Sequence, residues 1–108
     1  MPKYLVTANY GPEGTRGVIS GGGGTARVKA IGQLLESVGG TVESVYFAFG
    51  GTDVYIVVDA PDNVSVAAVV LTVRATGAIH SVDAVALLTP EEIDEASRRT
   101  VQYQPPGS

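Results

Sequence analysis

The strongest constraint on the fold is a pair of neighbouring segments, residues 42–49 and 54–59, that carry apolar side chains on both faces. Both are rich in β-branched and aromatic residues, which favour strands. Side chains alternate along a strand, so the second segment divides into Val54, Ile56 and Val58 against Tyr55 and Val57. The first segment divides in the same way, with Val45, Phe47 and Phe49 opposite Tyr46 and Ala48. A sheet of such strands needs cover on both sides, which favours self-association.

The turn between these segments contains Gly50-Gly51-Thr52. This spacing predicts a β-hairpin in which the glycines adopt positive φ. The remaining elements follow from local signals. Strands are expected over 3–10 and 79–88, and helices over 25–38 and 64–76.

The helix boundaries are marked by capping residues. Thr25 is the expected N-cap of the first helix, and Gly39-Gly40 its stop. Asp62 or Asn63 is placed to cap the second helix, which Gly77 ends. In the stretch 13–24 we expect no more than a short helical turn around 15–20.

The run Gly21–Gly24 precedes a helix, where free backbone N–H groups attract anions. A phosphate-binding loop would need a lysine directly before Thr25, and Gly24 stands there. The run is therefore interpreted as a flexible connector.

Near the end of the chain, Thr89-Pro90-Glu91-Glu92 predicts a short helix to about Thr100, with a capping box from Thr89 to Glu92. Residues 101–108 are expected to form a flexible tail. The order β-α-β-β-α-β predicts a ferredoxin-like α+β sandwich with a short C-terminal helix, as a single domain over residues 1–100. Its two long helices would cover one face of the sheet and leave the other open.

Charge and composition exclude several classes of partner. The net charge is −4, and the 7 Lys and Arg are scattered rather than clustered. We therefore expect neither nucleic acid nor an anionic membrane surface as partner. The absence of cysteine excludes thiolate chemistry and disulfides. No signal-peptide pattern or long apolar run is present, so a cytoplasmic location is expected.

Two residues are candidates for proton transfer. His80 is the only histidine, and its ordinary pKa near neutrality suits a general base. Asp53 begins the third strand and is the second candidate. The alternatives are a surface or interface histidine and a turn aspartate that accepts backbone N–H bonds. No ligand spacing for a metal is present, so no metal and no cofactor are expected.

Four further residues are candidates for binding a small molecule. In the usual strand order 4-1-3-2, Thr7, Asn9 and Tyr55 would share the open face of the sheet, and Tyr46 belongs to the neighbouring second strand. Apolar clefts with a few convergent polar groups are typical ligand sites. The open face is thus the expected site, and a small-molecule ligand the expected partner.

Several segments resemble the GYD domain family: Pro2–Val6, Tyr46–Gly50, Asp53-Val54 and Leu87–Glu92. The resemblance implies a dimeric α+β barrel, in which two ferredoxin-like units associate as a homodimer or larger homo-oligomer. Its superfamily relatives include monooxygenases, isomerases, haem-handling proteins and ligand-sensing domains. This sequence departs from the signature Gly-Tyr-Asp, because Thr52 stands in the tyrosine position.

These observations favour a self-associating small-ligand-binding or sensory module. One alternative is a small cofactor-independent enzyme, oxygenase-like or isomerase-like, which would use His80 or Asp53. The other is a structural oligomer without a ligand. The sequence offers no assembled pair of catalytic groups, which is why the binding module is preferred.

Overall fold

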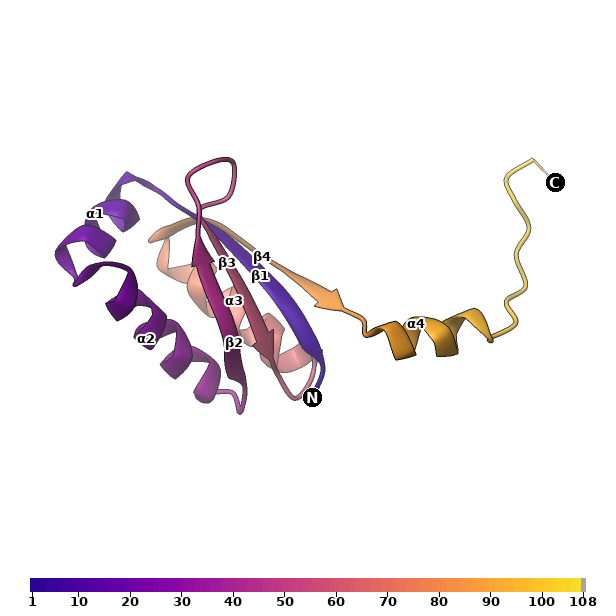
Figure 1. Ribbon diagram of the computed structural model, residues 1–108. Coiled ribbons are helices and arrows are strands. Elements are labelled where there is room, and N and C mark those ends of the chain that lie inside the picture. The colour runs from indigo at the N-terminus through magenta and orange to yellow at the C-terminus, as the bar shows by residue number, and fades with distance from the viewer. Residues whose placement is uncertain (108) are drawn as a thin grey trace.

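The computed structural model describes residues 1–107, which form one four-stranded sheet with helices packed on it (Figure 1). Along the chain the elements are β1 Lys3–Tyr10, α1 Pro12–Ser20, α2 Gly23–Glu36, β2 Thr41–Phe47, β3 Val54–Asp59, α3 Asn63–Thr76, β4 Ile79–Leu87 and α4 Pro90–Ser97. The ferredoxin-like α+β fold expected from the sequence is confirmed, with one helix more than predicted.

The sheet has the strand order β2-β3-β1-β4, and every neighbouring pair is antiparallel. The two central strands are therefore β1 and β3, as the 4-1-3-2 order requires. Val58 marks the register, because it lies opposite Tyr4 on β1 and Val42 on β2. Directly paired residues share a face, so these three side chains point to the same side.

Helices α2 and α3 cover that side, which forms the core. Val54 and Val58 are almost completely buried, with 1% and 0% of their surface exposed. Each contributes roughly 1.5–3 kcal/mol relative to an exposed side chain. They pack with apolar residues of β1, β3, β4 and both helices: Tyr4, Val6, Ile31, Leu35, Ile56, Val66, Val70 and Val82.

Helix α3 begins one residue before the predicted range, at Asn63, and has two of the predicted boundary residues, Asp62 and Gly77. The carboxylate of Asp62 accepts a hydrogen bond from the Ser65 backbone N–H at 2.8 Å, and Gly77 ends the helix with φ 71°. The bond from Ser65 lowers the pKa of Asp62 below its usual range, against a smaller opposing effect of burial.

Helix α4 also has its predicted start, with a reciprocal capping box between Thr89 and Glu92. Beyond Leu87 the chain leaves the body, and α4 projects away from the sheet (Figure 1). We call residues 88–107 the C-terminal arm. It accounts for the long axis of a molecule measuring 56 × 33 × 23 Å.

The stretch expected to hold at most a short turn contains a complete helix, α1, so that prediction was wrong. Pro12 occupies the first turn, where its missing N–H costs nothing. Gly14 lies directly against the Ala78 backbone, since a Cβ there would stand 2.6 Å from the Ala78 carbonyl oxygen. Close tertiary packing thus outweighs the weak helix propensity of the glycines.

Two predictions about glycines were also wrong. Helix α2 begins at Gly23 rather than after Thr25, because Gly22 (φ 102°) and Gly23 (φ 76°) make a tight turn between α1 and α2. Conversely, Gly50 and Gly51 do not adopt positive φ. The loop there closes through a hydrogen bond from Ala48 N–H to the Asp53 carbonyl, 2.7 Å long, which spreads the turn over more residues.

Candidate functional site

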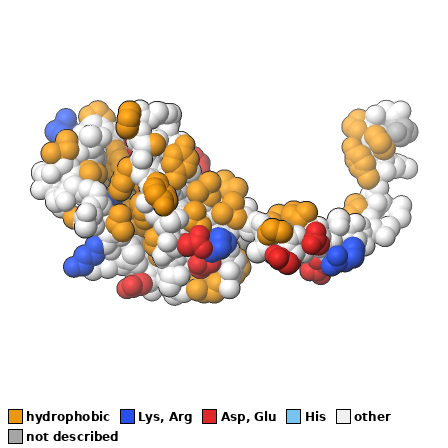
Figure 2. Space-filling view, viewed as in Figure 1, with side chains coloured by type: hydrophobic (Ala, Val, Ile, Leu, Met, Phe, Trp, Pro, Cys, Tyr) orange, Lys and Arg blue, Asp and Glu red, His pale blue; other side chains and the backbone are white. Residues whose placement is uncertain are grey.

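The face of the sheet opposite the helices, here called the open face, is apolar in its middle and polar at its ends. Its middle contains Leu5, Val57 and Val85, which the register places side by side across three strands. Figure 2 shows apolar side chains gathered over the strands on the side turned to the viewer. An uncovered apolar surface of this kind is typical of an interface.

One end of the open face is charged. The ammonium group of Lys3 lies 2.8 Å from a carboxylate oxygen of Asp59 and 2.8 Å from one of Glu43. The hydrogen bond to Asp59, followed by that to Glu43, raises the pKa of Lys3. Lys3 is therefore held in a fixed position at this edge of the apolar area.

The other end of the open face carries a chain of hydrogen bonds across three strands. Asn9 accepts from the Asp53 backbone N–H at 2.9 Å and donates to the Ser81 hydroxyl at 3.1 Å. The Asp53 carboxylate accepts from the Tyr10 backbone N–H at 2.8 Å. The structure thus brings together Asn9 and Asp53, two of the residues singled out from the sequence, and adds Ser81, which was not.

The other predicted binding residues also share this face. Tyr55 lies between Tyr46 on β2 and Thr7 on β1. The two tyrosines are exposed over 72% (Tyr46) and 42% (Tyr55) of their surface. The predicted grouping of these residues on the open face therefore exists within one chain. No element of residues 1–107 covers them from above, and their role in ligand binding stays a prediction.

His80 lies at an irregularity of the sheet. Tyr10 pairs with Ile79 and Asn9 with Ser81, which leaves His80 as the extra residue of a β-bulge. Its side chain is exposed. His80 lies on β4, whereas Asp53 directly precedes β3, and the role of His80 in proton transfer stays a prediction.

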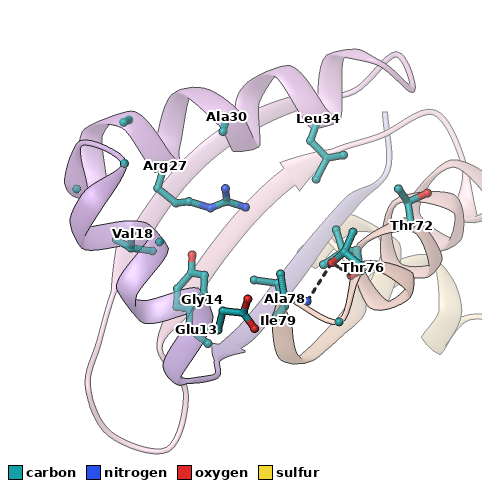
Figure 3. A pocket seen from close by; sticks show the side chains of 17 residues that line it. Glu13, Gly14, Val18, Arg27, Ala30, Leu34, Thr72, Thr76, Ala78 and Ile79 are labelled. Atoms are coloured by element: carbon teal, nitrogen blue, oxygen red, sulfur yellow. Dashed lines mark hydrogen bonds between the residues drawn. The ribbon is translucent and has the colours of Figure 1, made fainter.

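A cleft of about 700 Å³ lies on the opposite side of the molecule, between α1, α2 and the turn from α3 into β4 (Figure 3). Its walls are largely apolar and include Val18, Ala26, Ala30, Leu34, Val73, Ala78 and Ile79. Five side chains with hydrogen-bonding groups also line it: Tyr10, Glu13, Arg27, Thr72 and Thr76. Gly21 and Gly23 of the glycine run also line it, whereas none of the predicted catalytic and ligand-binding residues does.

Arg27 is the one basic residue that lines the cleft within residues 1–107. Its side chain extends from α2 towards the middle of the space (Figure 3). Its Nε atom is buried and has no hydrogen-bond partner. Arg27 could not be recognised as a site residue from the sequence, because the cleft depends on α1, and no periodic pattern indicates that helix.

Residues 1–107 contain neither a cluster of metal ligands nor a membrane-spanning helix. Within this part of the chain, no three acidic, histidine or cysteine side chains gather as metal ligands would. Nor does any helix there combine the length and hydropathy needed to cross a bilayer.

Comparison with known proteins decides the family. The model of the GYD domain matches residues 4–97, nearly the whole chain. The chain belongs to the GYD domain family. None of the curated proteins matches its sequence.

Two crystal structures resemble this GYD domain in fold. MtbAldR is 17% identical with a TM-score of 0.59, over 82% of this chain and 52% of MtbAldR. FFRP-DM1 is 12% identical with a TM-score of 0.55, over 82% of this chain and 100% of FFRP-DM1. The GYD domain chain thus spans about half the length of MtbAldR. At these identities the likeness concerns the fold alone.

Thr52 occupies the tyrosine position of the family signature, in the loop that joins β2 to β3. The glycine before it and the aspartate after it are retained as Gly51 and Asp53. In this chain Asp53 fixes the end of β1 through the Tyr10 N–H. The aspartate of the signature therefore has a structural contact that does not depend on the missing tyrosine ring.

Proposed function

We propose that this GYD domain protein is a self-associating module that binds a small molecule. The cleft between α1, α2 and α3 is the observation that carries the proposal. Its volume of about 700 Å³ falls in the range of small-molecule sites, roughly 300–1,000 Å³. Apolar walls with few polar groups are likewise typical of such sites.

Self-association is supported by the open face. Val85 and Tyr55 expose 54% and 42% of their surface there, beside Leu5 and Val57. A second copy placed face to face would bury both apolar areas through one self-complementary contact. The homodimer is thus the smallest assembly that covers the open face.

The enzyme alternative has less support. The Asp53 carboxylate is engaged by the backbone of Tyr10, 2.8 Å away, and His80 is exposed on an edge strand. A general base and a general acid need to converge on one reacting group. The hydrogen-bond chain through Asn9 instead connects Asp53 with Ser81.

Two measurements test the proposal. Light scattering at micromolar concentration should give a mass of at least two chains, and a monomer would contradict self-association. A thermal-shift screen against a metabolite library should give a compound whose stabilisation grows with its concentration.

The site is tested by a substitution in the cleft wall. Ala30 projects from α2 towards the cleft (Figure 3), so Ala30→Phe should fill it and abolish the shift. Ala68→Phe makes the same change at an exposed position of α3 and should retain the shift. Loss of the shift in both variants, or in neither, would contradict this location.

A further inference from the structure

We propose that the cleft between α1, α2 and α3 binds an organic carboxylate with an apolar body, and that the guanidinium of Arg27 binds the carboxylate group. This inference rests on the proposed function and specifies its ligand. It is supported by the position of Arg27 in the cleft and by the missing hydrogen-bond partner of its Nε–H group.

Arg27 is only partly satisfied. It is half-buried, and its Nε–H has lost water without gaining a protein acceptor. A buried donor without a partner costs about 1–3 kcal/mol, so buried polar groups are normally bonded. The guanidinium that carries this Nε extends into the cleft (Figure 3), where its outer N–H groups can donate to an acceptor supplied by a ligand.

The acidic residues of the chain leave Arg27 free. Within residues 1–107 the ion pairs engage Lys3, Arg74 and Arg99, and none includes Arg27. Glu13 lines the same cleft but lies too far from Arg27 to form an ion pair. No carboxylate of the described chain therefore pairs with the guanidinium of Arg27, and its N–H groups can donate to a ligand.

The shape of the guanidinium favours a carboxylate. Its parallel N–H groups match the two oxygens of a carboxylate in a bidentate contact. Phosphate also accepts such a contact, but it brings close to two negative charges. With Arg27 as the cation of the cleft and Glu13 also lining it, a singly charged anion is better matched.

The walls define the rest of the ligand. The cleft is lined mainly by aliphatic side chains and glycines, among them Gly14, Gly17, Val18, Ala26, Ala30, Leu34, Val73 and Ile79. The hydroxyls of Thr72 and Thr76 also line it but already donate to backbone carbonyls of α3, and Tyr10 adds one more hydroxyl. Such walls favour a compact hydrocarbon and offer little to a sugar or a nucleotide. A branched aliphatic or aromatic acid fits this description.

The test uses the full chain and named probes. Benzoate and 3-methylbutanoate are titrated into ¹⁵N-labelled protein, and the Arg27 Nε–H resonance is followed together with the backbone. Benzamide, which has the same body without the charge, and inorganic phosphate are titrated in parallel. We expect the two carboxylates to shift the Nε–H resonance in a saturable way. Benzamide and phosphate should leave this resonance unchanged.

Variants assign the effect to the guanidinium. Arg27→Gln should weaken carboxylate binding by roughly 10- to 100-fold, the loss expected for a hydrogen bond to a charged group. Lys29→Gln removes the same charge from an exposed position of α2 and should leave binding unchanged. If Arg27→Gln unfolds the chain, the Nε–H shift of the unaltered protein shows whether Arg27 contacts the carboxylate.

Distinct outcomes separate this inference from the proposed function. Carboxylate binding that survives in Arg27→Gln, or that benzamide or phosphate reproduces, would overturn the role of Arg27. A metabolite hit blocked by Ala30→Phe but indifferent to Arg27→Gln would overturn it as well, and the proposed function would stand. Absence of any shift with either carboxylate would also overturn it.

Discussion

The two faces of the sheet are built from the same kinds of residue but are covered differently. On β3, Val58 points to the helices and is completely buried, whereas its neighbour Val57 points to the open face and is half-buried. The covered face receives its cover from α2 and α3, which the chain connects to the strands. Nothing in the described chain covers the open face. The comparison shows that an apolar strand face can be completed either within the chain or by another molecule.

The difference between the two faces is tested most strongly by a charged side chain on the open face. Val57→Glu should weaken self-association by on the order of 100-fold or more, because an interface would have to bury a carboxylate without a partner. Sedimentation over a concentration series measures this. Val64→Glu, at an exposed position of α3, is the matched control and should associate normally. Equal association of both variants would show that the interface lies elsewhere.

The covered face is tested by truncation. Val58→Ala should lower the free energy of unfolding by about 2–3 kcal/mol, since it leaves a cavity in the core. Val57→Ala should cost less than about 1 kcal/mol when measured below the association concentration. Chemical denaturation provides both values. Equal costs would mean that the two faces are buried alike in the single chain.

The polar end of the open face is tested at Asp53. Asp53→Ala removes the acceptor of the Tyr10 N–H and should lower the free energy of unfolding by about 1–2 kcal/mol. Asp53→Asn keeps an acceptor and should cost less. A variant as stable as the original chain would indicate that the aspartate serves a purpose other than holding β1 to β3.

The smallest expected effect is the pH dependence of the stability that Asp62 contributes at the start of α3. Because the pKa of Asp62 is lowered in the folded chain by the Ser65 N–H, its contribution to stability is present above the unfolded pKa, about 4. It is lost as the pH falls through the folded value. Asp62→Asn retains a capping oxygen that does not titrate. Its stability should therefore fall less steeply below about pH 4, as thermal unfolding over an acid series would show.

The sequence predicted the elements whose signals are local. The bounds of β3 were correct because Val54–Asp59 is a short β-branched run between turn residues. The start of α4 was correct because its capping box is contained in four consecutive residues, Thr89–Glu92. Asp62 and Gly77 marked the ends of α3 for the same reason.

Features that depend on tertiary contacts were missed. Helix α1 contains glycines that lower its propensity, and its position depends on the contact between Gly14 and Ala78, distant in the sequence. Without α1 there is no cleft, and without the cleft Arg27 is one more surface cation of a helix. Asp53 was recognised as a residue of interest, but its partner Tyr10 lies on another strand.

The position of β1 in the sheet has a consequence for folding kinetics. This first strand is central, and both of its hydrogen-bonded neighbours, β3 and β4, come from the second half of the chain. During synthesis it emerges long before either partner exists. Closing loops of that length delays the first stable contacts. We therefore expect slower folding than for a helical protein of this size, with an apolar strand unpaired in the meantime.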